Sequence, residues 1–351
     1  MPAKKFSTVR RRLLTWYKHH QRNLPWRKTT DPYAIWVSET MLQQTQVKTV
    51  VPYYERFLNR FPNVEALARA PLDRVLHVWA GLGYYRRAEN LKTAARQVMR
   101  DYGGKLPSEH HQLRALPGIG DYTAGALLSI AFGKNSPAID SNVRRVLGRL
   151  NSTYKETQIR ALATQLVAGK RPGDVNQALM ELGATLCTPK TPDCSACPLG
   201  RECRSRSRDS KISARRVKRI SFTDVVWPLG IVRSGGKILL RRRSTGKLLA
   251  RLWELPGQET PSRGDSVRAL RRELRDFAIT SCNRRSIGEI RHAITYRRIR
   301  APIYLFECAS DSIPAQSQWR WLSLADAERY PISTLSKKAL ALLAVHETRS
   351  A

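Results

Sequence analysis

The sequence predicts a multidomain chain: an all-α domain of two lobes, followed by a smaller α/β domain. Its 351 residues exceed the size at which a single hydrophobic core usually stops growing. Apolar residues recur at helical spacing through residues 1–203, and short β-type runs follow in residues 225–345. Residues 204–224 between them are rich in arginine and poor in apolar side chains, which predicts a linker.

Turn residues divide the helical pattern of the first domain. Helices are expected where apolar side chains return every three or four positions, at residues 64–70, 91–98 and 161–167. Short segments that contain proline or glycine predict turns between the helices, at residues 31–32, 61–62, 103–104 and 116–118. In the second domain the pattern predicts strands and one helix, the strands at 225–232, 237–240 and 299–306 and the helix at 266–277.

The charge balance predicts a polyanionic partner. The 62 lysine and arginine residues outnumber the 28 acidic ones and give a net charge of +34, far beyond what solubility requires. Charge alone leaves nucleic acid and an anionic membrane surface both open. No apolar run could cross a bilayer, and the basic N-terminus lacks the apolar core of a signal peptide, so we expect a cytoplasmic protein with no membrane partner.

Four of the six cysteines fall within residues 187–203: Cys187, Cys194, Cys197 and Cys203, spaced C-x6-C-x2-C-x5-C. Clustered thiols in a reducing compartment indicate a metal centre rather than disulfides. A structural zinc site usually takes two C-x2-C pairs, and only one is present here. The uneven loops therefore favour a [4Fe-4S] cluster, with zinc as the alternative.

The stretch LPGIG, residues 116–120, places Gly118 and Gly120 directly before a helical pattern. Glycine lets backbone N–H groups approach a ligand closely, and a helix N-terminus attracts anions. The turn therefore suits contact with a phosphate group, although many helices simply begin after a glycine turn. Such a contact would hold a nucleic acid backbone without reading its sequence.

These motifs, together with AIDSNVRRV at 138–146 and SETMLQQTQV at 38–47, resemble the helix-hairpin-helix (endonuclease III-like) DNA glycosylase superfamily, and within it the adenine glycosylases of the MutY family. The likeness covers nearly the whole chain. It implies an enzyme that removes a base from duplex DNA. It also implies a structural [4Fe-4S] cluster on the four cysteines, whose loop presents basic residues to DNA.

Two carboxyl groups are candidates for the chemistry, because base release needs a proton for the departing base and a negative charge near the cationic sugar. Glu39 lies among apolar residues 35–37 and 41–42, which would raise its pKa and keep it protonated. Asp140, or the serine after it, should cap a helix, where the helix dipole favours an anion. The resemblance implies that Glu39 is the general acid at adenine N7 and Asp140 the stabilising carboxylate, with Asn142 close by.

Tyr122 decides the type of reaction. In relatives that also cut the DNA backbone, a lysine takes this place and forms a Schiff base with the sugar. A tyrosine cannot form that imine, so water must complete the reaction and leave an abasic site. We expect Tyr122 to hydrogen-bond Asp140 or this water; simple packing against the hairpin is the alternative.

A base stacked in duplex DNA is out of reach of such groups, so the target nucleotide must be flipped out and the gap filled. The resemblance assigns intercalation to Gln44 and Tyr84, with Gln43 beside Gln44. It assigns contacts with the flipped adenine to Leu24, Trp26, Arg27 and Gln177.

Residues 248–259, LLARLWELPGQE, resemble the Nudix-like domain with which the family inspects the opposite base, 8-oxoguanine. An active Nudix hydrolase holds magnesium with several glutamates. These glutamates are depleted here: the chain keeps Arg272-Glu273-Leu274 but continues with Arg275 and Asp276 instead of further glutamates. We therefore predict no pyrophosphatase activity.

The family's Phe-Ser-His loop, which recognises the oxidised guanine, is replaced by Ile294, Thr295 and Tyr296. Thr295 keeps a hydroxyl that could bind the lesion, whereas the phenyl and imidazole rings of the family motif are gone. Preference for the opposite base is thus the feature in which the chain departs most from its family.

The sequence as a whole predicts a monofunctional adenine glycosylase of base excision repair. We expect a monomer, associated with the nucleoid, that binds double-stranded DNA with adenine opposite 8-oxoguanine or guanine. A thymine or uracil glycosylase for G/T or G/U mismatches is the alternative, but such proteins generally lack a second domain like residues 225–345. A DNA-binding protein without catalysis is disfavoured by the two retained carboxyl groups.

Overall fold

The computed structural model describes residues 3–206, 221–244, 248–260, 266–275, 282–308 and 318–350. Most of the expected linker, residues 207–220, and the end of the expected helix at Phe277 lie outside the described residues. Contacts within the chain divide it into two compact units, Met1–Ala70 with Arg86–Val217, and Pro71–Tyr85 with Lys218–Ala351.

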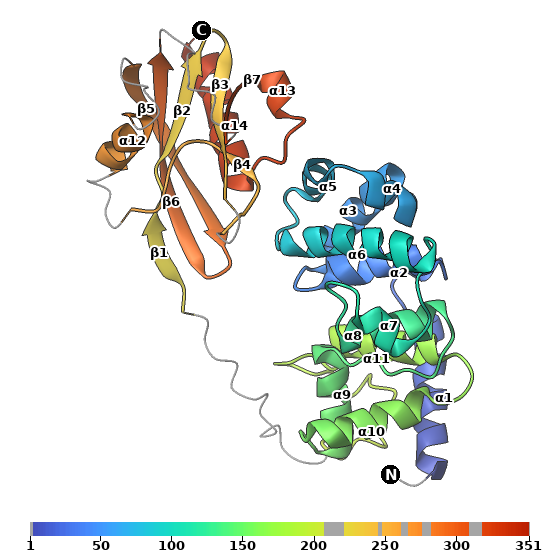
Figure 1. Ribbon diagram of the computed structural model, residues 1–351. Helices are drawn as coiled ribbons and strands as arrows, with labels where there is room; N and C mark the ends of the chain where they lie inside the picture. Colours follow the sequence, from blue (N-terminus) through green and yellow to red (C-terminus); the bar gives the residue numbers. More distant parts are fainter. Residues whose placement is uncertain are drawn as a thin grey trace. The chain divides into compact units, whose positions relative to one another are not determined.

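The first unit is helical (Figure 1). Its elements are α1 (Ala3–His20), the 3-10 helix η1 (Pro25–Arg27), α2 (Pro32–Leu42), α3 (Val47–Arg60), α4 (Val64–Arg69), α6 (Arg86–Tyr102), α7 (His110–Arg114), α8 (Asp121–Ala126), the π-helix η2 (Leu127–Ala131), α9 (Ser141–Asn151), α10 (Glu156–Val167) and α11 (Pro172–Thr185). The helices expected from apolar spacing are confirmed as α4 and as parts of α6 and α10. Helix α5 (Leu72–Trp79) falls within residues grouped with the second unit.

The helices pack as two lobes. In one lobe, α1 packs against α9, α10 and α11 around a core that includes Leu13, Leu147, Leu166 and Leu179. In the other, α2 contacts α3, α6 and α8, and α4 packs on α6. The π-helix η2 contacts both α2 and α11 and so joins the lobes. The expected two-lobed helical domain is therefore present.

Helix α2 runs through the interior of its lobe, because every residue from Tyr33 to Met41 is buried. The Asp31 side chain caps the helix by accepting hydrogen bonds from the backbone N–H groups of Tyr33 and Ala34. Pro32 at the first position has no N–H group to leave unpaired. The local sequence thus starts a helix that carries a carboxyl group, Glu39, into an apolar interior.

The second unit holds a mixed β-sheet. Its strands are β1 (Thr223–Val226), β2 (Leu229–Ser234), β3 (Lys237–Arg242), β4 (Trp253–Glu254), β5 (Cys282–Ile294), β6 (Arg297–Cys308) and β7 (Trp319–Ser323), and its helices besides α5 are α12 (Ser266–Arg275), α13 (Leu324–Ala327) and α14 (Thr334–Ser350). The order β1-β6-β2-β3-β4 forms the main path, and β5 pairs with β6 and β7 with β3. Strand β6 is parallel to β1 and β2 and antiparallel to β5.

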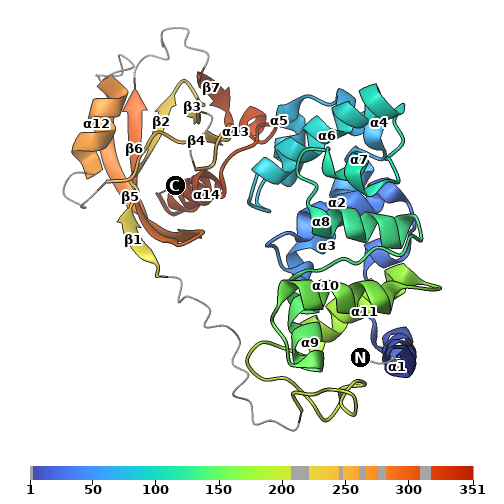
Figure 2. The ribbon, with the colours of Figure 1, turned by 60° about the horizontal axis from the view of Figure 1, so that its bottom comes forward.

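Helices cover both faces of this sheet. Leu270 and Leu274 of α12 pack with Phe306 on one face, and Leu335 and Leu343 of α14 belong to the core on the other. Figure 2 shows α12 and α14 on opposite sides of the strands. The α/β character expected for this domain is confirmed.

One expected strand differs from the structure. The run 225–232 is divided into β1 and β2, because Pro228 lies between them and has no N–H group to donate to a ladder. Among the described residues, no helix has the length and apolar character needed to cross a membrane.

Candidate active site

Glu39 lies near the end of α2 and is only 5% exposed. Its Oε2 atom accepts a 2.6 Å hydrogen bond from the Tyr122 hydroxyl. Burial raises the pKa of Glu39 to about 7, and the charge of Asp140 acts in the same direction, whereas the Tyr122 hydrogen bond and the charge of Arg27 oppose the rise. The carboxyl group can therefore keep a proton near neutral pH, as expected from its apolar neighbours.

Tyr122 lies in the first turn of α8, directly after the glycine turn. Its hydroxyl donates to Glu39 and lies 3.6 Å from the Met180 sulfur. Burial raises the pKa of Tyr122 well above its usual value, and the charges of Glu39 and Asp140 add to this, so the phenol stays a neutral donor. The expected hydrogen bond to Asp140 was wrong: the hydroxyl binds Glu39, because α8 packs against α2.

Asp140 is the N-cap of α9, as expected. Its Oδ1 atom accepts from the Val143 N–H group at 2.7 Å, and its Oδ2 atom accepts from the Asn142 amide at 2.9 Å. Burial raises the pKa of Asp140, while these two donors and the Arg145 charge lower it. The helix dipole was expected to favour the anion of Asp140, and so to lower its pKa; the pKa is raised instead, because Asp140 is partly buried.

A second layer of contacts fixes the cap. Arg145 Nη2 donates to the Asn142 side-chain oxygen at 2.7 Å and to the Gly183 carbonyl at 2.6 Å, which orients the Asn142 amide toward Asp140. A Cβ atom at Gly183 would lie 2.6 Å from the Asn142 Cβ. Glycine is therefore needed for α11 to approach α9 this closely. Neither Arg145 nor Gly183 was expected from the sequence.

The residues predicted to contact a flipped adenine lie on η1 and α11. Leu24 and Trp26 are buried, and Arg27 and Gln177 are partly buried. Arg27 forms a 2.7 Å ion pair with Glu181 of α11, whose side chain is fully buried. Glu181 was missed by sequence reasoning, although a charged residue within the apolar run ALMELG was the signal that could have revealed it.

Glu181 also pairs with Arg22 at 2.8 Å, so two guanidinium groups compensate one buried carboxylate. These hydrogen bonds outweigh burial and hold the pKa of Glu181 at about 2. A buried ion pair that is fully hydrogen-bonded fixes geometry even where it adds little stability. The pair thus anchors the η1 turn, with Leu24 and Trp26, to α11.

The glycine turn has the backbone that its sequence requires. Gly118 has φ +82°, and a Cβ atom there would lie 2.9 Å from the Asn90 Cβ. Gly120 is the N-cap of α8 and supplies no side-chain cap. Arg114 holds the turn by donating to the Ile119 carbonyl at 2.9 Å.

Two residues assigned to intercalation have strained backbones. Gln44, which is exposed, has φ +59°, and Tyr84, 47% exposed, has φ +49°. Such angles are uncommon for residues other than glycine and cost about 1–3 kcal/mol, so the surroundings must enforce them. For Gln44, Arg87 does this by donating to two carbonyl groups at the end of α2, at 3.0 and 2.6 Å. Gln43, between α2 and Gln44, is partly buried.

The four clustered cysteines lie in the loop after α11. Cys187, Cys197 and Cys203 are partly buried, and Cys194 is exposed. Burial raises the pKa of Cys197 to about 11, and the charges of the other three thiols act in the same direction. Arg149 Nη1 donates to the Cys187 sulfur at 3.3 Å. Within the described residues, no three ligand-type side chains are arranged to hold a metal ion. In chemical type, however, four thiols beside a cation match the ligands of an anionic iron-sulfur cluster.

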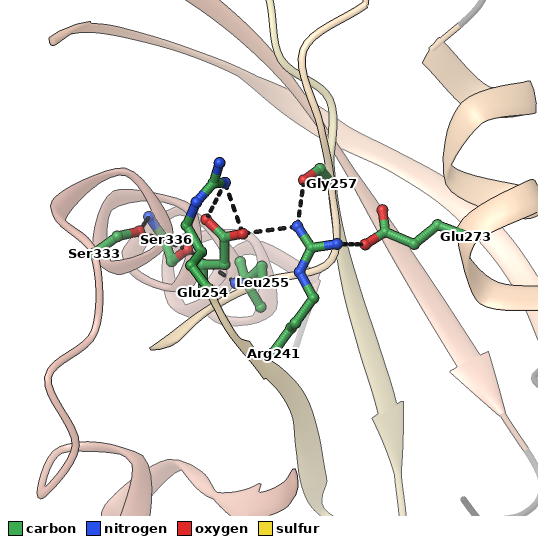
Figure 3. A network of polar contacts seen from close by, with 8 residues as sticks. Arg241, Glu254, Leu255, Gly257, Glu273, Ser333 and Ser336 are labelled. Atoms are coloured by element: carbon green, nitrogen blue, oxygen red, sulfur yellow. Dashed lines mark hydrogen bonds and ion pairs between the residues drawn. The ribbon is translucent and has the colours of Figure 1, made fainter. Parts of the chain in front are cut away.

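In the second unit, a buried charge network links β3, β4 and α12 (Figure 3). Glu254 and Glu273 are 2% and 8% exposed. Arg241 donates to Glu254 at 2.7 Å, to the Gly257 carbonyl at 3.0 Å and to Glu273. Arg243 adds hydrogen bonds of 2.8 and 2.9 Å to Glu254.

This network does not fit the divalent cation that an active Nudix hydrolase would hold. The two buried glutamates are already bridged by the Arg241 guanidinium, which supplies the positive charge that a metal would bring. Arg241 was not noted in the sequence, because nothing local distinguishes it from its arginine neighbours. Thr295 lies in the turn between β5 and β6, is exposed and has φ +54°.

Residues 37–169 match the HhH-GPD superfamily of base excision DNA repair proteins, and residues 229–342 match the NUDIX domain. The fold and the hairpin site therefore define a DNA glycosylase of the helix-hairpin-helix class. The chain is 36% identical to the adenine DNA glycosylase of Homo sapiens, over 93% of this chain and 72% of that protein, and 35% identical to that of Rattus norvegicus, over 97% and 78%. It belongs to the adenine DNA glycosylase family.

Among solved structures, a thermostable thymine-DNA glycosylase superposes with a TM-score of 0.54 at 33% identity. The alignment covers 58% of this chain and 97% of that one. The two proteins thus share the helical glycosylase fold.

Proposed function

We propose that this chain hydrolyses the N-glycosidic bond of adenine mispaired with 8-oxoguanine or guanine in duplex DNA and leaves an abasic site. One observation carries the proposal: Glu39 is a buried carboxyl group that accepts a hydrogen bond from the Tyr122 hydroxyl. Its pKa is about 7, and the charge of Asp140 contributes to that rise. Glycosidic hydrolysis needs such a pair, one carboxyl group protonated and one ionised.

In the proposed reaction, Glu39 gives its proton to N7 of the flipped adenine. The bond between adenine N9 and sugar C1′ then breaks, and its electron pair leaves with the base. The cationic sugar that remains is stabilised by the Asp140 carboxylate, which is held by the Val143 N–H group and Asn142. Water adds to C1′ and gives up its proton to a carboxylate, which completes the hydrolysis.

Tyr122 limits the chemistry to base removal. The phenol has no amine with which to form a Schiff base, so no covalent intermediate leads to strand cleavage. Its hydrogen bond to Glu39 also positions the general acid, since the carboxyl group is otherwise surrounded by apolar residues of α2. Tyr122 therefore positions the general acid in an enzyme that removes the base without cutting the strand.

The remaining contacts follow the same proposal. Backbone N–H groups at Gly118 and Gly120 would bind a DNA phosphate, and Gln44 and Tyr84 would fill the space left by the extruded nucleotide. Cys187, Cys194, Cys197 and Cys203 would hold a [4Fe-4S] cluster, whose chemistry here is structural, fixing the loop that follows α11. The net charge of +34 favours binding to nucleoid DNA, and a monomer suffices because one chain carries all these groups.

The test uses duplexes that carry adenine, thymine or uracil opposite guanine or 8-oxoguanine. We expect adenine release, seen as strand cleavage only after hot alkali. Strand breaks without alkali would contradict the monofunctional mechanism, and release of thymine or uracil instead of adenine would contradict the substrate.

Thymine excision is the second candidate, because the helical unit resembles a thymine-DNA glycosylase at 33% identity. The thymine enzyme's chain aligns over 97% of its own length with only 58% of this one, so a large part of this chain has no counterpart in it. Residues 229–342 match the NUDIX domain, and this additional domain favours adenine as the substrate. The same set of duplexes distinguishes the two.

A further inference from the structure

An open cavity of about 690 Å³ lies beside α1 in the first unit. It is lined by residues of α1 between Phe6 and His19, and by Gln165, Ala168 and Arg171 from the end of α10 to the start of α11. Figure 1 shows α1 alongside α10, and the two helices are in contact. None of the residues assigned to the candidate active site lines this cavity, which we call the α1 groove.

The charged side chains of the α1 groove are basic. Arg10, Arg11, Lys18 and Arg171 line it, and among its described lining residues there is no aspartate or glutamate. Within the described part of the chain, Arg11 and Lys18 pair with no acidic side chain, whereas Arg12 of the same helix pairs with Glu202 at 3.2 Å. Cations that converge on a concave surface attract and concentrate anions.

Arg10 is fixed by the segment between α10 and α11. Its Nε atom donates to the Leu166 carbonyl at 3.0 Å, and its Nη2 atom donates to the Lys170 carbonyl. Burial lowers the pKa of Arg10, and the charge of Arg171 acts in the same direction. An anion bound beside both guanidinium groups would offset this unfavourable interaction between like charges.

Arg171 reaches the α1 groove from a strained backbone. It directly precedes α11 with φ +63°, an angle that residues other than glycine rarely adopt. Such strain clusters at functional sites. Arg171 pairs with Asp174 at 2.6 Å, yet its side chain stays 57% exposed, so it can also contact a bound anion.

We propose that the α1 groove binds consecutive phosphate groups of a nucleic acid strand, at a site distinct from the one that removes the base. Arg11 and Lys18 lie on one face of α1 about two turns apart, which separates them by about 10 Å along the helix axis. A chain of phosphate groups can contact both cations at once, and Arg10 with Arg171 provides a third point of contact.

The apolar part of the lining favours nucleic acid over inorganic polyphosphate as the source of these phosphates. Phe6 and Leu14 line the α1 groove and are only partly buried. A nucleic acid strand carries bases that can stack on an aromatic ring while its phosphates contact the cations. Polyphosphate offers nothing to the apolar side chains.

The experiment measures binding of a fluorescent oligothymidylate to the full chain, whose active site is first saturated with a short unlabelled duplex. The double variant Arg11→Gln and Lys18→Gln removes two cations of the α1 groove. Arg60→Gln with Lys105→Gln, which are exposed residues of the same unit outside the groove, removes the same charge and is the matched control. Arg11→Lys with Lys18→Arg keeps both charges.

Fluorescence anisotropy should show that the groove variant binds the oligothymidylate about tenfold more weakly than the wild type, with less than a twofold change for the control and for the charge-preserving variant. Because each phosphate contact of a single strand contributes about 0.7 to the slope of log K against log salt, the loss of two contacts should reduce that slope by about 1.4. An equal loss in the groove variant and the control, or no loss, would overturn the proposal.

Two further measurements separate the other occupants. The groove variant should keep the wild-type affinity for the duplex and the wild-type rate of base release; a matching loss of duplex affinity would place the groove in the duplex site and overturn a distinct one. Inorganic polyphosphate is added as a competitor of the labelled strand. We expect unlabelled oligothymidylate to displace the probe at a lower phosphate concentration, and the reverse order would overturn the choice of nucleic acid.

Discussion

Replacing Tyr122 by phenylalanine isolates the hydrogen bond to Glu39. The 2.6 Å contact lowers the pKa of Glu39, because the hydroxyl donates to the ionised carboxylate more strongly than to the neutral acid. A hydrogen bond to a charged group contributes about 1.5–3 kcal/mol. Since one pKa unit corresponds to about 1.4 kcal/mol, its loss should raise the pKa of Glu39 by about 1 to 2 units above its present value near 7.

The assay is single-turnover adenine release from pH 5 to 10. The reaction needs protonated Glu39, so the wild-type rate should fall as pH rises through about 7. In Tyr122→Phe this fall should move to higher pH by about 1 to 2 units. A midpoint that stays in place or moves to lower pH would refute the assignment of Glu39 as the general acid governed by Tyr122.

Four further outcomes follow from the structure. Asp140→Asn keeps a helix cap but loses the charge, so base release should fall at least a hundredfold, about the contribution of one charge-stabilising group, with unchanged DNA affinity by anisotropy; loss of both would make the residue a structural cap. Gly183→Ala must push α11 from α9 and should destabilise the fold by about 1–3 kcal/mol, seen as a lower melting temperature, while Gly133→Ala, whose Cβ would meet no atom within 4 Å but whose φ is +64°, measures the cost of backbone strain without a clash. Cys197→Ser should reduce the iron content and visible absorbance of the purified protein, and full retention of both would exclude a role as ligand. Because Arg241 bridges the glutamates of the second unit, the chain should hydrolyse no nucleoside triphosphate with Mg²⁺, and Mn²⁺ should leave its melting temperature unchanged.

Local sequence predicted those parts of the fold that depend on local rules. Asp140 was expected to cap a helix because a short acceptor precedes a helical apolar pattern, and it does so. The division of residues 225–232 into β1 and β2 could have been foreseen from Pro228. The pairing of β1 with β6 could not, because it joins segments about seventy residues apart and depends on packing of the whole sheet.

The site was predicted less evenly. Glu39 was identified from apolar neighbours on its own helix, and its raised pKa follows from the same burial. The partner of Tyr122 was mistaken, because which carboxyl group its hydroxyl reaches depends on how α8 packs against α2. Arg145 and Glu181 were missed for a similar reason, because the contact partner of each lies on another helix. Arg145 donates to the Gly183 carbonyl of α11, and Glu181 pairs with Arg27 of η1.

The two carboxyl groups differ both in burial and in their hydrogen-bond donors. Burial raises the pKa of both, and Glu39 is buried whereas Asp140 is only partly buried. Glu39 accepts one hydrogen bond, from a neutral phenol. Asp140 accepts hydrogen bonds from the Val143 N–H group and the Asn142 amide, and the charge of Arg145 stabilises its carboxylate. Because the charge of Asp140 also raises the pKa of Glu39, the first negative charge of the pair should reside on Asp140. The remaining proton then stays on Glu39, where the departing base needs it.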